Sequence, residues 1–449
     1  LTIPDEVYGL KAEIQVRTIA QHAWADIGHD RFSKNAFPLP QRHVRQSARA
    51  AAMLENADEA FARVAKEIDE YRTSYDTYMD RPEMEQELQG LELVFEKDRH
   101  NPELARRIVR LAICLEAWEK VIGFLEEEYQ GAETAPLLGA LGFAYCQKHR
   151  QNRLSSEYKQ GQLYLERVVR EHPDHWEALT RLADSWFGIN DREALSWYER
   201  AFRANPHDPG AVAGYLTLKI ARDKNPALAS MFSPSLQAAI AKCREQIEIG
   251  INLPAAWYHL GEFLVLTDRP YESLAAYCRG ISVTSGPVAL QAALSLIEKL
   301  IDVRQQLPSL EWISRLLHLA KAAKFPHGEP QRELQPLLSQ PDWKIEPPVV
   351  IVAGGCDAAV EQQMQQYRAL LIAAFDGFQG TVISGGTTAG ISGLVGELSE
   401  VYAGQICTVG YVPKYTPANV IEDNRYTRLR RHEGTDFTAL EPIQNWIDL

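Results

Sequence analysis

The sequence predicts a multidomain protein of mixed α and α/β class, in which a helical array separates an N-terminal module from a C-terminal domain with a parallel sheet. Three observations predict this class. The chain has 449 residues, which is too long for a single hydrophobic core. Helical periodicity recurs in pairs from residue 83 to about residue 338. Beyond residue 348, short apolar runs end in glycines, as buried parallel strands do.

The composition of the chain argues against several classes of protein. A hydrophobic share of 45% and a charged share of 24% are those of an ordinary globular protein. The formal net charge of −13 argues against a dedicated nucleic-acid binder, which needs a basic surface. Because no apolar run approaches the roughly 20 residues of a membrane span, we expect a cytoplasmic protein without a membrane partner. The six cysteines are scattered singly, a pattern that predicts buried, reduced thiols.

A strictly alternating run near the N-terminal end predicts a β-strand with Glu13, Gln15 and Arg17 on one face. Thr18 and Gln21 follow at the spacing of a capping box, which predicts that a helix begins there. An acid, an amide and a guanidinium in a row suit a pocket that holds a metal and a phosphorylated substrate. On pattern alone, an edge strand with a solvated polar face is an equal alternative.

The run E-I-Q-V-R-T that begins at Glu13, with the H-A-W-A that begins at His22, resembles the last strand and following helix of the RelA/SpoT-type alarmone synthetase domain. Members of that family transfer pyrophosphate from ATP to the 3′-hydroxyl of a guanine nucleotide. The resemblance implies that Glu13 is catalytic and contacts Mg²⁺. It also implies that Gln15, Arg17 and His22 shape the substrate site. A carboxylate suits this reaction, because the hydroxyl must be oriented and deprotonated while a metal neutralises phosphate charge.

The resemblance extends through the amphipathic helical run that contains Leu54 and Phe61, and residues 1–80 are therefore expected to be the C-terminal part of such a domain. In other members the basic ATP-binding helix, a guanine-stacking tyrosine and the aspartate that shares the Mg²⁺ with Glu13 all lie upstream. We therefore expect that this chain alone does not catalyse the transfer.

Pairs of predicted helices between residues 83 and 340 repeat one spacing of small and aromatic residues. The clearest copy comprises Leu260, Gly261, Leu264, Ser273, Tyr277 and Gly280. This spacing is similar to that of tetratricopeptide repeats, and two further copies and a degenerate pair over 102–129 precede it. Such pairs cannot bury their apolar faces alone, which predicts an α-solenoid. Its groove is expected to bind a peptide, a partner protein or another domain of the same chain. An irregular helical bundle is the alternative.

Residues 341–348 are rich in proline and predict a linker before a domain over 349–449. An apolar run from Val349 predicts a buried strand that ends at two glycines, and a second strand over 381–383 leads into a glycine-rich loop and then a helix. Strand, glycine loop and helix N-terminus together aim backbone N–H groups at an anion. The spacing fits neither a Walker loop nor a dinucleotide fingerprint. A turn whose glycines serve only close helix–strand packing is the alternative.

The sequences A-G-G from Ala353 and S-G-G-T-x-x-G-I from Ser384 resemble the SLOG (LSDAT) superfamily of Rossmann-like nucleotide-sensing domains. The most similar branch is related to the N-terminal region of TRPM channels and to bacterial defence sensors of cyclic or ADP-ribose-type nucleotides. Because other members carry a further glycine-rich segment, the domain is expected to be incomplete here. The resemblance implies that a nucleotide effector is lined by Gly354, Gly355, Ser384, Gly385, Gly386, Thr387, Thr388 and Gly390. Two alternatives remain open for a basic run: it contacts the phosphates of the effector, or it forms a solvated loop. The run comprises Arg425, Arg428, Arg430 and Arg431.

Together, these features predict an alarmone synthetase that uses Mg²⁺, ATP and a purine nucleotide. A nucleotide effector in the C-terminal domain would regulate it through the solenoid, in stress or phage-defence signalling. The alternative is a non-catalytic nucleotide-sensing scaffold that recruits a protein partner. A homo-oligomer is compatible with either function.

Overall fold

In the computed structural model the chain divides into two compact units, Leu1–Asp76 and Thr77–Leu449. The described part of the chain is mostly helical and contains one four-stranded parallel sheet, so the mixed α and α/β class is confirmed at this level. The structure describes residues 18, 41–42, 45–58, 81–129, 134–326, 334–338, 345–354 and 364–449.

The first unit contains a helix over residues 45–58. The hydroxyl of Thr18 donates a hydrogen bond to Asp58 Oδ2, at the end of this helix, over 2.5 Å. The predicted capping partner Gln21 lies outside the described residues.

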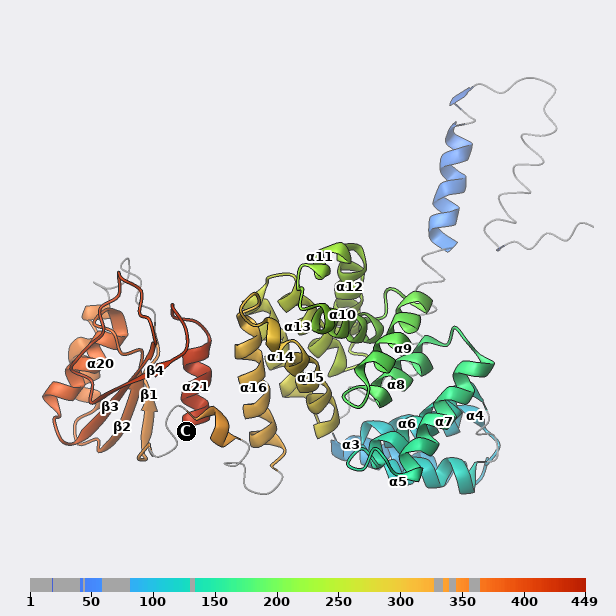
Figure 1. Ribbon diagram of the computed structural model, residues 1–449, viewed down its shortest axis with the longest axis horizontal. Coiled ribbons are helices and arrows are strands. Elements are labelled where there is room, and N and C mark those ends of the chain that lie inside the picture. The colour runs from blue at the N-terminus through green and yellow to red at the C-terminus, as the bar shows by residue number, and fades with distance from the viewer. Residues whose placement is uncertain are drawn as a thin grey trace, which may run out of the picture. The chain divides into compact units, whose positions relative to one another are not determined.

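The second unit begins with helices that pack in consecutive pairs (Figure 1). The predicted pairs are observed as α6 with α7, α8 with α9 and α13 with α14. The helices are α3 (Arg81–Phe95), α4 (Pro102–Cys114), α5 (Trp118–Gly123), η4 (Phe124–Glu128), α6 (Ala135–Lys148), α7 (Ser156–Glu171), α8 (Trp176–Trp186), α9 (Asp191–Ala204), α10 (Pro209–Asp223), α11 (Leu228–Met231), α12 (Ser233–Ile249), α13 (Ala255–Leu266), α14 (Pro270–Val283), α15 (Pro287–Lys299), η5 (Ile301–Val303) and α16 (Ser309–Lys324).

Small residues of the repeated pattern lie where two helices of a pair approach closely. A Cβ atom on Gly142 of α6 would lie 2.8 Å from the carbonyl oxygen of Gly161 on α7. A Cβ atom on Gly261 of α13 would lie 2.6 Å from the ring of Tyr277 on α14. Any larger side chain at these glycines would force the helices apart, because protein interiors are close-packed. This explains why glycine recurs where the two helices of a pair approach each other.

Helix α15 is held at both ends by residues that lie far earlier in the sequence. The N–H of Val288 in its first turn donates to Glu116 Oε1 over 2.9 Å. This carboxylate therefore acts as the helix cap that Gly286, the residue before α15, cannot provide. At the other end, Lys299 Nζ lies 2.5 Å from Asp191 Oδ2 and 5.3 Å from the centre of the Phe187 ring. These contacts bring the later helices of the array onto the earlier ones.

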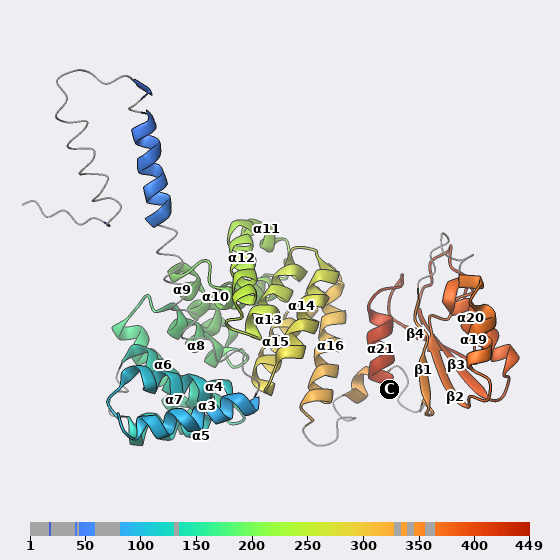
Figure 2. The same cartoon turned by 180° about the vertical axis from the view of Figure 1, so that it is seen from behind.

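The sheet has the strand order β1-β2-β3-β4 with every neighbouring pair parallel, as expected for the C-terminal residues. Figures 1 and 2 show α19 and α20 on one face of this sheet and α21 on the other. Because Arg428–His432 is a strand paired with β3, the prediction of a solvated loop is wrong for these residues. The elements are β1 (Val349–Ile351), α19 (Arg368–Ala374), β2 (Gly380–Ser384), α20 (Gly390–Val401), β3 (Ile406–Pro413), β4 (Arg428–His432) and α21 (Leu440–Asp448).

Helix α21 packs against two different parts of the unit. Leu440 and Ile443 lie in an apolar cluster with Trp312 of α16. Its other side faces the sheet, where Asp448 accepts hydrogen bonds from Tyr411 Oη over 2.8 Å and from Arg430 Nη1 over 3.0 Å. Helix α21 thus joins the sheet to the last long helix of the array.

Two expectations from composition can be compared with the structure. Cys146 and Cys243 are buried free thiols, as predicted, but Cys278 is exposed, so the prediction of uniform burial is wrong there. Among the described helices, none combines the length and apolarity that a membrane crossing requires.

A buried carboxylate inside the helical array shapes its response to pH. Glu262 of α13 is only 1% exposed and accepts a hydrogen bond from the hydroxyl of Thr217 on α10. Burial raises the pKa of Glu262 from an ordinary value of 4.5 to about 7, against the smaller opposite effect of the Thr217 hydrogen bond. The pKa of Glu262 is therefore higher in the folded state than in the unfolded state. As a result, the contribution of Glu262 to stability is complete below about pH 4.5 and is lost as the pH rises through about 7.

Replacing this carboxylate by an amide, Glu262→Gln, should raise the free energy of unfolding at pH 8 by up to roughly 3 kcal/mol. The amide oxygen still accepts the Thr217 hydrogen bond but carries no charge to desolvate. At pH 5 the two proteins should differ little. Urea unfolding at both pH values measures this, with the exposed Glu248→Gln on α12 as the matched control. A Gln variant no more stable than the wild type at pH 8 contradicts the assignment.

Candidate ligand-binding site at the glycine loop

The residues predicted for catalysis and substrate binding, Glu13, Gln15, Arg17 and His22, lie outside the described residues. Their assignment, including the Mg²⁺ contact of Glu13, stays a prediction. Within the described ranges, no group of three or more His, Cys, Asp or Glu side chains is arranged to hold a metal ion.

The glycine loop, residues 385–389, joins the carboxyl end of β2 to the first residue of α20. Gly386 and Gly390 have φ angles of 72° and 62°, in the left-handed region that glycine adopts without strain. A Cβ atom on Gly386 would lie 3.0 Å from the Cα atom of Gly410 on β3, so this glycine also allows the loop to pack on the sheet. Packing therefore accounts for Gly386.

We call the described residues 345–354 and 364–449 the α/β part. The structure brings the predicted residues of this part together at the carboxyl edge of the sheet. The hydroxyl of Ser384 donates to the carbonyl oxygen of Val352, the residue after β1, over 2.7 Å. A Cβ atom on Gly354 would lie 2.7 Å from Ile391 Cγ2 in the first turn of α20. Gly355 lies outside the described residues. Buried positions are Ser384, Gly386, Thr387 and Gly390, whereas the accessible rim comprises Gly354, Gly385 and Thr388.

The N-terminus of α20 opens onto this rim without a side-chain cap. Its N-cap residue is Ala389, in an extended conformation with no side-chain hydrogen bond to the helix. The first N–H groups of a helix have no partner within the helix, and they carry the positive end of its dipole. The loop's own donors are partly used, since Thr387 N–H donates to Ser392 Oγ over 2.9 Å and Thr388 N–H to the Ile421 carbonyl over 3.0 Å.

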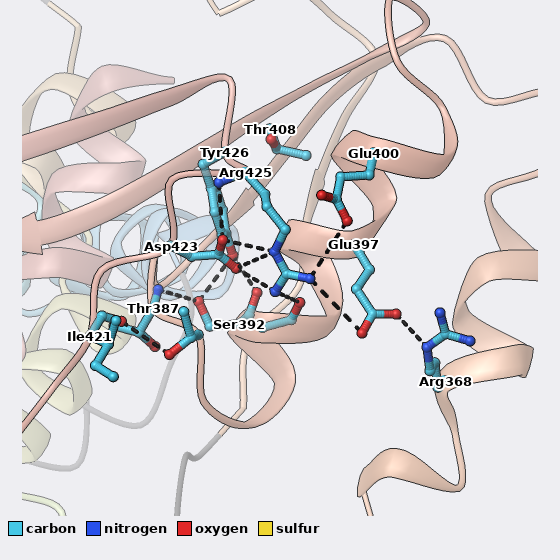
Figure 3. A network of polar contacts seen from close by, with 12 residues as sticks. Arg368, Thr387, Ser392, Glu397, Glu400, Thr408, Ile421, Asp423, Arg425 and Tyr426 are labelled. Atoms are coloured by element: carbon cyan, nitrogen blue, oxygen red, sulfur yellow. Dashed lines mark hydrogen bonds and ion pairs between the residues drawn. The ribbon is translucent and has the colours of Figure 1, made fainter.

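An ion-pair network behind the loop holds α20 against the segment that follows β3 (Figure 3). Arg425 donates from Nε and Nη2 to the two oxygens of Asp423, over 2.9 and 2.8 Å, and from Nη2 to the Gly393 carbonyl over 3.0 Å. Asp423 is only 1% exposed. The hydrogen bond to Asp423 is the main cause that raises the pKa of Arg425. The hydrogen bonds of Arg425 therefore hold α20 in place.

Tyr426 supports the loop from below through a second set of hydrogen bonds. Its hydroxyl donates to the carbonyl oxygen of Ser392 over 2.7 Å and lies 3.0 Å from Ser392 Oγ. Because Ser392 Oγ accepts the N–H of Thr387, the three residues form a continuous buttress under the glycine loop. Burial raises the pKa of Tyr426, so the phenol stays protonated. Sequence reasoning missed Tyr426 and Asp423, because no local pattern marks residues whose partners lie far earlier in the chain.

The other three arginines of the expected phosphate-binding set have different roles. Arg430 is buried and paired with Asp448. Arg431 forms a two-pronged ion pair with Glu422, at 2.7 and 2.5 Å. Arg428 is exposed at the start of β4. Arg428 and Arg431 are thus both exposed, and Arg431 lies nearer to the carboxyl end of β4.

Neither models of known protein families nor characterised proteins match this chain. The candidate site therefore rests on the residues and geometry described above.

Removing the hydroxyl of the buttress, Tyr426→Phe, should destabilise the α/β part by about 1–3 kcal/mol, because the Ser392 carbonyl and hydroxyl lose a buried partner. Amide exchange over residues 385–391 should accelerate. The matched control is Tyr402→Phe, which deletes one hydrogen bond, to the Ile372 carbonyl at 2.7 Å, away from the loop. Equal exchange in the two variants would mean that Tyr426 does not hold the loop.

Proposed function

We propose that the α/β part binds a nucleotide or related phosphate-bearing effector at the glycine loop. This effector would regulate ATP-dependent pyrophosphate transfer to the 3′-hydroxyl of a purine nucleotide. The observation that carries the binding proposal is the uncapped N-terminus of α20, held behind a pre-shaped glycine loop at the carboxyl edge of a parallel sheet.

The chemistry of this edge suits a phosphate. Ligands of open α/β sheets bind outside the carboxyl ends of the strands, where loops and helix N-termini meet. A phosphate there gains backbone N–H hydrogen bonds and the favourable end of the helix dipole. Gly354 and Gly385 are accessible at this rim, where a bulky anion can approach their backbone. The buttress of Tyr426 and Ser392 lowers the ordering cost of binding, because the loop is held in one conformation before the ligand arrives.

The transfer proposal rests on the residues near the N-terminal end. Glu13 would orient and deprotonate the acceptor 3′-hydroxyl, whose oxygen then bonds to the β-phosphorus of ATP while AMP leaves. Gln15, Arg17 and His22 would position the nucleotides. Mg²⁺, shared by Glu13 and an upstream aspartate, would neutralise phosphate charge.

Regulation requires that the effector bind two states of the protein with unequal affinity. Helix α21 offers a physical route for such a difference within the second unit. It is bonded to the sheet through Asp448 and packed on α16 through Leu440 and Ile443. A shift of the sheet on ligand binding would therefore reach the helical array through one rigid element.

Substituting the N-cap of α20 provides a test that separates binding from stability. Ala389→Asp should stabilise the fold by about 0.5–2 kcal/mol, since aspartate is a favoured N-cap. It should also weaken nucleotide binding by about tenfold or more, because its carboxylate occupies the anion position. Calorimetric titration and thermal shifts with ADP-ribose, cyclic ADP-ribose, ADP and GDP measure both effects. Ala389→Asn is the uncharged control and should weaken binding less. Undiminished affinity in the Asp variant would refute the site.

Catalysis is tested separately in the full-length protein. Glu13→Gln should lower pyrophosphate transfer from labelled ATP to GDP, GTP or adenine nucleotides by roughly 10²–10⁴-fold, the usual worth of a general base. Effector binding at the glycine loop should be unchanged. Glu55→Gln, at an exposed position of the 45–58 helix, is the matched control. Transfer that is absent in the wild type under every condition, or unaffected by Glu13→Gln, leaves the non-catalytic nucleotide-sensing scaffold as the function.

A further inference from the structure

A cavity of about 390 Å³ lies apart from the glycine loop, where the α/β part meets α16 and the short helix η6 (Gln335–Leu337). None of the residues that line it belongs to the glycine loop. Its polar wall comprises Arg315, Lys414, Arg431, His432, Glu433 and Gln444. The volume is within the range of small-molecule sites, which starts at about 300 Å³.

Positive charge dominates the lining of this cavity. Lys414, Arg431 and Arg315 face one carboxylate, Glu433, which is largely exposed and pairs with Lys414 at 2.9 Å. An exposed pair of this kind holds its partner weakly. The carboxylates that pair with Arg315 and Arg431 come from Glu311 and Glu422, which do not line the cavity.

The wall of the cavity is fixed by buried hydrogen bonds. Gln444 of α21 is fully buried, and its Nε2 donates to the Leu337 carbonyl over 2.8 Å and to Asp448 Oδ1 over 2.9 Å. Arg315 of α16 donates to the side-chain oxygen of Gln444. One cationic wall therefore belongs to the helical array, whereas Lys414 and Arg431 belong to the carboxyl edge of the sheet. An anion inside would contact both.

The geometry points to a second anion site: we propose that this cavity binds a phosphate-bearing small molecule, which fastens the α/β part to α16. The site is separate from the proposed effector site but connected to it. Glu422, the partner of Arg431, forms a backbone bridge to Thr387 of the glycine loop. Cations from α16 and from the edge of the sheet line one partly open cavity, which favours a multiply charged group such as a pyrophosphate over a single carboxylate.

The probe for this site is inorganic pyrophosphate, used at constant ionic strength because exposed charges are screened by salt. Pyrophosphate should raise the melting temperature of the full chain by mass action. Lys414→Gln should weaken its binding by about tenfold, the loss of one charge-assisted hydrogen bond, as measured by calorimetric titration. Lys159→Gln, at an exposed lysine of α7, removes the same charge elsewhere and should bind as the wild type does. Equal affinity in the Lys414 and Lys159 variants overturns the proposal.

The Ala389→Asp variant separates this site from the glycine loop. If pyrophosphate still stabilises Ala389→Asp and ceases to do so when Lys414→Gln is added, the cavity is the second site. If Ala389→Asp alone abolishes all stabilisation, the cavity does not bind and only the glycine-loop proposal stands. If Lys414→Gln alone abolishes it, the cavity stands and pyrophosphate does not bind at the glycine loop.

Discussion

The arrangement of the second unit depends on one buried ion pair, between Arg430 of β4 and Asp448 of α21. Their side chains are 4% and 3% exposed, so neither charge is compensated by bulk water. Removing one partner of such a pair costs about 3–5 kcal/mol, because the other charge is left buried. Tyr411 and Gln444 supply further hydrogen bonds to the Asp448 carboxylate, which lowers the cost of burying it. This cluster holds α21 on the sheet, and α21 in turn packs on α16. The cavity between Arg315 and Lys414 depends on this packing.

Close packing and anion binding at the glycine loop are compatible explanations of the same sequence. Gly386 is needed because its positive φ and its contact with Gly410 seat the loop on β3. This contact, together with the Tyr426 buttress, fixes the position of the first turn of α20 at the edge of the sheet. The donors of Thr387 and Thr388 hold the loop in shape, whereas the helix N-terminus after Ala389 has no side-chain cap. Packing thus provides the preorganisation on which binding would draw.

Sequence patterns predicted those parts of the structure whose causes are local. A glycine facing a partner helix, as at Gly261, recurs with the period of the helix pair and could be recognised, as could the strand, loop and helix around Ser384. Arg430 could not be interpreted correctly, because a charged strand looks solvated unless its distant partner Asp448 is known. Asp423 was missed for the same reason, since it holds Arg425, and the bond of Arg425 to the Gly393 carbonyl on α20 is a tertiary contact that no short-range spacing encodes. The predicted catalytic strand with Glu13 lies outside the described residues and remains a prediction.

The two proposed anion sites are linked through one residue, Glu422, and this determines the sign of their coupling. Glu422 is held by Arg431 on the cavity side, while its backbone bridges Thr387 on the loop side. An anion in the cavity competes with Glu422 for the guanidinium of Arg431, which leaves the Glu422 charge less compensated beside the glycine loop. An uncompensated negative charge there raises the free energy of a phosphate at the loop. Occupancy of the cavity therefore opposes effector binding, and by thermodynamic reciprocity the effector opposes occupancy of the cavity to the same extent. A phosphate-bearing metabolite that locks the α/β part onto α16 would thus act as an antagonist of the effector.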